Sequence, residues 1–332
     1  MKIPVLVTGV GGGVGQSIIK SLQSTDYRVV GVDSEELATG LYAVKSGYKG
    51  HYANSRFFIS RLLEICKIEK CRLLFVGHDI ELKAIAENID LFKSIGTIPI
   101  VSSTKAIEIS DDKLSTCEFL KSNGFIVPET HQFHKTDINS IIFPVILKPQ
   151  RGGARSRKTY IANSINEFKI FSQLIDKDNC VVQEYIEGDE FTCGSITFDG
   201  KCRGVIAMRR TLRDGDTYKA FVDQDPNVIN TVQRAVEALK PLGPCNIQLR
   251  LRTGIPIIFE INARCSGTTG ARTLAGFNEP KMTADFLLTN LEPIFSIREI
   301  TILRYWQEIV IANSHINELR QLGHIEGSMI TL

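Results

Sequence analysis

The first third of the chain carries the pattern that most restricts its fold. An apolar run at 3–8 (IPVLVT) is followed by GVGGGVG, a helical pattern at 16–24 and a second apolar run at 27–32 that ends at Asp33. A strand, a glycine loop, a helix and a second strand in this order form a βαβ unit, whose two strands lie parallel in one sheet. Two later apolar runs, near residues 72–77 and 98–101, extend the unit. Residues 1–110 are therefore predicted to form one doubly wound α/β domain of about four parallel strands.

The glycine loop leaves two interpretations open. Its glycines fall as Gly9-x-x-Gly12-x-x-Gly15, which resembles the short-chain dehydrogenase signature, and Asp33 lies about where a ribose-binding acid would be expected. This spacing favours a nicotinamide-dependent oxidoreductase. Against it, those dehydrogenases use a Y-x-x-x-K pair, and no tyrosine of this chain has a lysine four residues later. The alternative is that the glycines only let helix and strand pack closely.

A second constraint lies at 245–264 (CNIQLRLRTGIPIIFEINAR). Apolar-rich runs at 246–252 and 256–262 flank Thr253-Gly254 and predict a β-hairpin. Glu260 stands in Ile-Ile-Phe-Glu-Ile, a run typical of a buried strand, where an unpaired carboxylate costs roughly several kcal/mol. A positive group is therefore expected next to this carboxylate.

The length of the hairpin loop decides which side chains meet Glu260. Because side chains alternate along a strand, a three-residue loop at 253–255 places Gln248 opposite Glu260. A three-residue loop at 252–254 makes them diagonal neighbours on the same face. A two-residue loop puts them on opposite faces, so the interpretation requires an odd loop.

With an odd loop, Gln248, Glu260 and Asn262 share one face. All three offer oxygen atoms and no His or Cys is near, which favours Mg²⁺ as the ligand. The alternative is a half-exposed hairpin in which Glu260 pairs with Arg250 or Arg264.

The middle of the chain predicts an anion site. The apolar strand at 144–149 ends in Lys148 and precedes Gln-Arg-Gly-Gly-Ala-Arg-Ser. A lysine at a strand tip beside a Gly-Gly turn can hold phosphate by charge, while backbone N–H groups cradle it. Lys113 lies in the first turn of a predicted helix, where the helix dipole disfavours a cation and a nearby anion would explain it. A simple basic hairpin and an ordinary surface lysine are the alternatives.

Composition excludes several classes of function. The chain has 332 residues, enough for two or three domains, and a formal charge of +2, which gives no basic footprint for nucleic acid. No apolar run approaches the roughly 20 residues of a membrane span, and the N-terminus lacks a signal-peptide cleavage pattern. The 8 cysteines follow no C-x-x-C pattern and are typical of reduced thiols. We therefore expect a cytoplasmic protein that binds neither nucleic acid nor membrane, and a homodimer is compatible with the sequence.

The order of these features resembles the ATP-grasp superfamily, most closely the stand-alone relatives of the carbamoyl-phosphate synthase large subunit. The resemblance rests on Lys113, the lysine-tipped strand before Gly-Gly, the segment QEYIEG at 183–188, and Gln248 followed by E-I-N on paired strands. It implies an α/β plus α+β fold, in which a Rossmann-like (pre-ATP-grasp) domain precedes a two-lobed ATP-grasp domain. The implied boundaries are 1–110 for the first domain, 111–187 for a small lobe with helical linker and glycine lid, and 188–332 for a large lobe with the metal site.

The resemblance also implies roles for residues at matching positions. ATP phosphates would contact Lys113, Lys148 and a lid that includes Arg151, Gly152, Gly153 and Ser156. Adenine and ribose would contact Glu184, Tyr185, Ile186 and Glu190. One or two Mg²⁺ (or Mn²⁺) would be held by Gln248, Glu260 and Asn262, although Gln248 stands where many members have an acid. The catalytic candidates are Lys148 and Arg264, and Arg264 would contact the γ-phosphate or the acyl phosphate. The substrate carboxylate would be bound by Arg209, Arg210 or Arg272.

The activity implied is that of an ATP-dependent carboxylate–amine (or ammonia) ligase. A small-molecule carboxylate would take the γ-phosphate of MgATP to form an acyl phosphate, and the amine of a second substrate would displace phosphate. The chain is too short for a complete carbamoyl-phosphate synthase, which has two such units. The alternatives are an NAD(P)-dependent oxidoreductase and an accessory protein that binds ATP without turnover.

Overall fold

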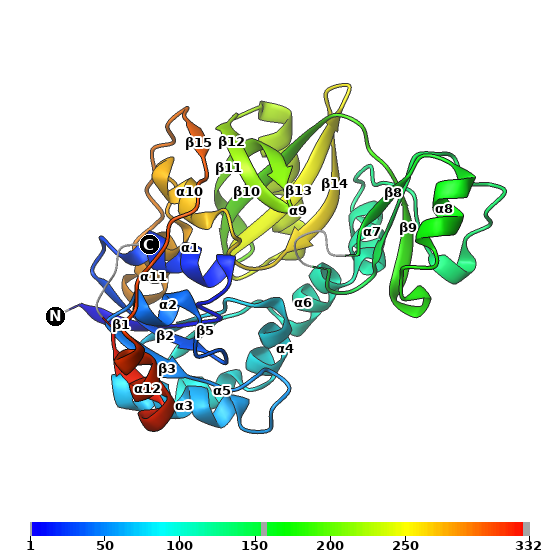
Figure 1. Ribbon diagram of the computed structural model, residues 1–332. Helices are drawn as coiled ribbons and strands as arrows, with labels where there is room; N and C mark the ends of the chain where they lie inside the picture. Colours follow the sequence, from blue (N-terminus) through cyan, green and yellow to red (C-terminus); the bar gives the residue numbers. More distant parts are fainter. Residues whose placement is uncertain (1, 154–157, 328–332) are drawn as a thin grey trace.

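The computed structural model describes residues 2–153 and 158–327. Within these residues the strands form three sheets, two of six strands and one of four. Figure 1 shows an α/β domain built from the start of the chain, a large antiparallel lobe beside it, and a smaller lobe that projects from the large one. This confirms the predicted fold class, a doubly wound domain followed by two α+β lobes.

The first sheet is a parallel sheet with one antiparallel edge strand. Its order is β16-β3-β2-β1-β4-β5, and β16 runs antiparallel to β3. The strands are β1 (Ile3–Thr8), β2 (Tyr27–Asp33), β3 (Ser46–Lys49), β4 (Leu73–Phe75), β5 (Ile98–Ile100) and β16 (His324–Glu326). Because β16 returns to this sheet, the range 188–332 that the sequence assigns to the large lobe contains a strand of the first domain.

Helices cover both faces of the first sheet. One apolar core packs against α1 (Gly13–Leu22), α2 (Thr39–Tyr42) and α12 (Asn313–Leu322). The core on the other face packs against α3 (Phe58–Glu69), α4 (Asp79–Glu87) and α5 (Ile89–Ser94). No helix in the described part of the chain is long and apolar enough to cross a membrane.

The large lobe is an antiparallel sheet of order β14-β13-β10-β11-β12-β15. One face packs against α9 (Pro226–Leu239), and the other against α10 (Thr269–Leu274) and α11 (Glu279–Thr289), which also contact α1. Strand β11 continues beyond Arg209, and the chain returns as β12. The strands are β10 (Asp189–Phe198), β11 (Lys201–Arg213), β12 (Asp216–Val222), β13 (Gly243–Arg252), β14 (Ile255–Asn262) and β15 (Thr301–Leu303).

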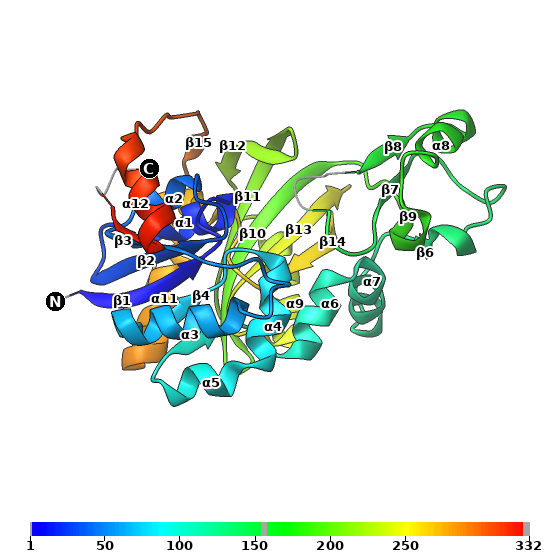
Figure 2. The same ribbon diagram turned by 60° about the horizontal axis from the view of Figure 1, so that its bottom comes forward.

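The small lobe is a four-stranded sheet of order β6-β9-β7-β8. Its strands are β6 (Thr130–Gln132), β7 (Val145–Pro149), β8 (Tyr160–Ala162) and β9 (Cys180–Glu184), and its helices are α8 (Ile165–Phe171) and the 3₁₀ turns η1 (Phe133–Lys135) and η3 (Lys177–Asn179). It follows the linker helices α6 (Thr104–Asp111) and α7 (Lys113–Ser122). Figure 2 shows this lobe extending away from the first domain, with α6 and α7 at its base.

The β13–β14 hairpin has the expected pairing but not the expected loop. The loop is the two-residue turn Thr253-Gly254, in which both residues have positive φ (47° and 84°), as a type I′ turn requires. Gln248 nevertheless pairs with Glu260, because the register shifts between Gln248 and Leu249 and leaves Phe259 as an extra residue. This β-bulge, not an odd loop, supplies the additional residue and brings the two polar faces together.

Candidate functional site

A cavity of about 310 Å³ lies between the small-lobe sheet and the large-lobe sheet. The two lobes meet here at the segment 184–186, which leads from β9 toward β10. A volume of roughly 300 Å³ is at the lower end for small-molecule sites. Of the residues assigned from the sequence, ten line this cavity: Lys113, Lys148, Gly153, Glu184, Tyr185, Ile186, Glu190, Arg210, Gln248 and Glu260.

Lys148 is a buried cation without an anionic partner among the described residues. Its side chain projects from β7 into the cavity, the residue is 6% exposed, and Nζ lies 5.5 Å from the centre of the Phe259 ring. Burial, assisted by the nearby charge of Lys113, lowers the pKa of Lys148 to about 8. The charges of Glu260 and Glu190 offset only part of this effect, and neither carboxylate forms an ion pair with the ammonium. A buried ammonium without an ion-pair partner is unfavourable, so this position favours an anionic ligand.

Lys113 brings a second positive charge to the same end of the cavity. It follows Asp112, which caps α7 by accepting hydrogen bonds from two backbone N–H groups, and Lys113 Nζ donates to the carbonyl of Gly152 at 3.0 Å. Burial acts to raise the pKa of Glu260, but the charges of Lys113 and Lys148 outweigh it and hold that pKa below its usual value. The carboxylate is thus kept ionised between the two lysines.

The three expected metal ligands meet on one face of the hairpin. Glu260 Oε1 accepts hydrogen bonds from Gln248 Nε2 (3.3 Å) and Asn262 Nδ2 (3.0 Å). The amide oxygens accept from arginines instead, Gln248 Oε1 from Arg210 (2.7 Å) and Asn262 Oδ1 from Arg264 (3.1 Å).

This donor set fits a divalent cation that arrives with its other ligands. One carboxylate and two amide oxygens are hard donors, and Mg²⁺ usually takes one or two carboxylates together with waters and phosphates. No group of three His, Cys, Asp or Glu residues in the described ranges could hold a metal by itself. To bind the ion, the amide oxygens must leave their arginine partners.

Arg264 is held by the first domain. Its Nε and Nη2 donate to the two carboxylate oxygens of Asp79 at 2.7 and 2.6 Å, and Nη1 donates to the carbonyl of Cys265. Arg264 does not line the cavity, but it is hydrogen-bonded to Asn262 and so contacts the metal set, by which we mean Gln248, Glu260 and Asn262. No sequence motif relates Asp79 to Arg264, which lies 185 positions later in the chain.

A network of arginines borders the same cavity. Arg210 donates twice to Glu190 Oε1, Arg250 donates to Glu190 Oε2, and both oxygens of this expected ribose ligand are therefore engaged. Arg250 also donates to the hydroxyl of Tyr185 and the carbonyl of Ile186. The sequence interpretation missed Arg250 as a cavity residue, although strand alternation puts it on the face of Gln248.

Two of the three expected substrate arginines do not fit that role. Arg209 lies on the opposite face of β11 from Arg210, with its guanidinium 4.8 Å from the centre of the Phe221 ring. Arg272 is 0% exposed, because it lies on α10, which is packed against α1. The guanidinium of Arg272 is fully committed to Glu279, Asn246, Ser266, Thr268 and Thr269.

The beginning of the expected lid is fixed by α7. Arg151 pairs with Asp112 at 2.9 Å, so its guanidinium is held at the helix terminus and does not line the cavity. Gly152 and Gly153 follow with φ of 72° and 81°, values that favour glycine, and only Gly153 borders the cavity. Ser156 lies outside the described residues.

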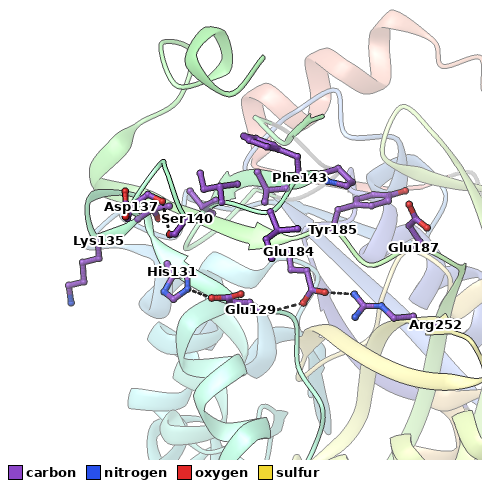
Figure 3. A pocket seen from close by; sticks show the side chains of 16 residues that line it. Glu129, His131, Lys135, Asp137, Ser140, Phe143, Glu184, Tyr185, Glu187 and Arg252 are labelled. Carbon is purple, nitrogen blue, oxygen red and sulfur yellow. Dashed lines mark hydrogen bonds and ion pairs between the residues drawn. The ribbon is translucent and has the colours of Figure 1, made fainter. Parts of the chain in front are cut away.

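The side chain of Glu184 points away from the cavity and toward a second pocket. This pocket, of about 700 Å³, lies on the other face of the small-lobe sheet. Figure 3 shows the Glu184 carboxylate between Arg252 and the backbone of Glu129, whose N–H donates to it at 3.1 Å. The expected adenine contact through this side chain is therefore not supported, whereas Tyr185 and Ile186 border the cavity between the lobes.

The glycine loop of the first domain is filled by its own chain. Asp33 accepts hydrogen bonds from the N–H groups of Gly11 (2.7 Å) and Glu35 (2.9 Å). A Cβ on Gly15 would lie 2.4 Å from the carbonyl oxygen of Gly9. These contacts favour the interpretation in which the glycines serve close packing, and they engage the acid that a dinucleotide would need.

Comparisons with known proteins find similarity in both parts of the chain. Residues 5–101 match the family "PylC-like, N-terminal domain", and residues 176–307 match "ATP-grasp in the biosynthetic pathway with Ter operon". The chain is 23% identical over 190 residues to D-alanine--D-alanine ligase A of Bacillus cereus, covering 51% of this chain and 62% of that protein. It is 26% identical over 130 residues to a carbamoyl-phosphate synthase of Methanobrevibacter smithii, covering 38% and 35%. The matches thus span less than two thirds of either relative.

Solved structures share the arrangement of the whole chain. N5-carboxyaminoimidazole synthetase of Staphylococcus aureus, complexed with ADP, aligns with a TM-score of 0.69 at 17% identity, covering 91% of this chain and 81% of that one. An N5-carboxyaminoimidazole ribonucleotide synthetase in its ADP complex aligns with a TM-score of 0.73 at 13% identity, covering 97% and 85%. At these identities the likeness shows the fold alone.

Proposed function

Because the chain is an ATP-grasp superfamily protein with a PylC-like N-terminal domain, we propose that it is an ATP-dependent carboxylate–amine ligase that acts through an acyl phosphate. The observation that carries the proposal is Lys148, a buried ammonium with no carboxylate partner among the described residues. It faces a cavity that also holds Lys113 and Glu260. A nucleoside triphosphate would place its phosphates next to the two lysines, and its divalent cation would bind the carboxylate of Glu260.

The proposed reaction transfers phosphate and then forms a C–N bond. An oxygen of the substrate carboxylate attacks the γ-phosphorus of ATP, the bond to the β,γ-bridging oxygen breaks, and ADP leaves. The amine nitrogen of the second substrate then attacks the acyl carbon, phosphate leaves with the C–O electron pair, and the nitrogen loses a proton to water. Phosphoryl transfer needs alignment and charge neutralisation more than covalent help, which agrees with a site built from lysines, arginines and one carboxylate.

In this proposal, one end of the cavity binds the phosphates and the metal ion, and the other end binds the base. Lys113 and Lys148 would neutralise the phosphates, and Mg²⁺ (or Mn²⁺) held by Glu260 with Gln248 and Asn262 would supply further charge neutralisation. At the other end, Ile146, Ile186 and Phe259 offer apolar surface for a flat base beside the backbone of 184–186. Names among the relatives include an amino-acid ligase and D-alanine--D-alanine ligases, which supports amino acids as the first substrates to test.

The test is formation of ADP, phosphate and a coupled product from MgATP and pairs of amino acids. We expect phosphate release that depends on both a carboxylate and an amine, with the condensed product seen by mass spectrometry. Binding of MgADP without turnover across a broad panel would favour the accessory-protein alternative. Binding of NADH but not of ATP in a thermal-shift assay would reject the ligase and favour the oxidoreductase.

A further inference from the structure

One ion pair connects the first domain to Arg264, which is hydrogen-bonded to the expected metal ligand Asn262. Asp79 is the first residue of α4, beyond the parallel strand β4, and Arg264 lies two residues beyond Glu260-Ile-Asn262 on the large lobe. The two N–H···O contacts, at 2.7 and 2.6 Å, form a bidentate pair, which is the strongest arrangement of these groups. The Arg264 side chain is 11% exposed and that of Asp79 is 35% exposed, so water reaches the pair mainly at the Asp79 carboxylate.

Arg264 lies one hydrogen-bonded side chain away from the carboxylate of the metal set. Its Nη2 donates to Asn262 Oδ1 (3.1 Å), and Asn262 Nδ2 donates to Glu260 Oε1 (3.0 Å). Burial acts to lower the pKa of Arg264, but the charges of Asp79 and Glu260 hold it above its usual value. Arg264 is therefore attracted by two carboxylates, and Asp79 is the one that it binds.

We propose that Asp79 is a positioning residue of the metal site, which keeps Arg264 from pairing with Glu260 and so leaves this carboxylate free for a divalent cation. The inference rests on the proposed function, because it assumes that the cation arrives with a nucleotide. Without Asp79, the buried guanidinium would seek the remaining nearby carboxylate, and Arg264 would compete with Mg²⁺ for Glu260. Partners that orient metal ligands commonly change metal affinity by roughly 10–100-fold when mutated.

The experiment compares ADP binding with and without Mg²⁺ by isothermal titration calorimetry on the full chain. For Asp79→Asn we expect the Mg²⁺ concentration that gives half-maximal tightening of ADP binding to rise by roughly tenfold or more. ADP binding in EDTA should not change. A pair that only holds the domains together would weaken both measurements equally or neither, and either result would overturn the proposal. The matched control is Asp90→Asn, an exposed acid in the first turn of α5, which should leave both measurements unchanged.

A double-mutant cycle keeps the proposal testable if Asp79→Asn folds poorly. In Asp79→Asn/Arg264→Gln the competing cation is gone, so the double variant should need no more Mg²⁺ than Arg264→Gln alone. Additive losses would contradict the proposal. Failure of the unmodified protein to bind ADP under any condition would reject the proposed function itself, whereas normal Mg²⁺-dependent binding with an unaffected Asp79→Asn variant would reject only the role of Asp79.

Discussion

At the scale of single residues, the proposed role of Lys148 in binding phosphate comes with a cost in stability. Its ammonium is buried beside Phe259 and another lysine, so methionine of similar length would remove an unpaired charge from the interior. We expect Lys148→Met to weaken MgADP binding by roughly 10–100-fold, as expected for loss of a hydrogen bond to a charged group, and to raise or preserve the thermal midpoint of the free protein. Calorimetry and thermal unfolding measure the two effects, and exposed Lys169→Met on α8 is the control. A lower midpoint with unchanged binding would contradict the assignment.

The lowered pKa of Lys148 leads us to expect a pH dependence of both nucleotide binding and stability. Its pKa is lowered to about 8 in the folded protein, from an ordinary value of 10.5, so between these values the unfolded state binds more protons. The contribution of Lys148 therefore makes the folded state more stable as the pH rises through this window. Phosphate binding requires the charged form, so we expect MgADP affinity to fall as the pH rises above about 8, with proton uptake on binding. Calorimetry in buffers of different ionisation enthalpy measures that uptake, and Lys148→Met should lack both the uptake and this part of the pH slope.

Several site residues could be predicted from local pattern, and others could not. Lys148 and Glu260 each stand in an apolar strand, where a charge is costly unless an opposite charge meets it, and both line the cavity. Arg209 and Arg210 are adjacent in sequence, so only knowledge of which face of β11 borders the cleft separates them. Arg272 follows a small-residue loop that resembles an anion-binding turn, and its burial arises from packing of α10 on α1, which no local pattern encodes.

At the scale of elements, the β13–β14 hairpin has the expected pairing of Gln248 with Glu260, but a bulge and not an odd loop produces it. Alternation and the Thr-Gly turn predict two paired strands, but a bulge at Phe259 leaves no mark that distinguishes it from a regular strand residue. The odd residue is in the strand and not in the loop. Strand β1 has the bounds expected from its apolar run at 3–8, whereas β15 is short because only three of its residues pair with β12.

The turn of this hairpin predicts a stabilising substitution. Thr253 is β-branched and adopts φ of 47°, a left-handed conformation that such residues rarely occupy, and it is exposed. Asn-Gly is the preferred pair for a type I′ turn, so we expect Thr253→Asn to raise the free energy of unfolding by about 0.5–1 kcal/mol. Urea unfolding measures the change, and Thr104→Asn, at an exposed threonine with negative φ, is the comparison. Destabilisation by Thr253→Asn would show that the turn geometry is wrong.

At the scale of the whole molecule, the chain closes its first domain with its last described strand. After the large lobe it returns through α12, and β16 pairs with β3, the strand at the edge of the parallel part of the sheet. Figure 1 shows this segment lying against the helices and strands of the first domain. The sequence could not predict the return, because β16 is short and its partner lies far away in the chain. Leu319 and Ile325 bury their side chains in the core that also contains β1 and β2.

Because of this closure, we expect that the first domain can be destabilised without affecting the proposed nucleotide site. Leu319 is 0% exposed and Leu322, one turn later on the same helix, is 60% exposed. We expect Leu319→Ala to lower the free energy of unfolding by roughly 2–5 kcal/mol, whereas Leu322→Ala should have little effect.

Hydrogen exchange should show faster opening of β3 and α2 than of β10 and β13 in the Leu319 variant, because the first domain and the large lobe have separate cores. Since Lys148 and Glu260 lie in the lobes, MgADP should still bind to the folded variant with unchanged affinity. Equal loss of protection in all three sheets would instead show that the domains unfold as one cooperative unit.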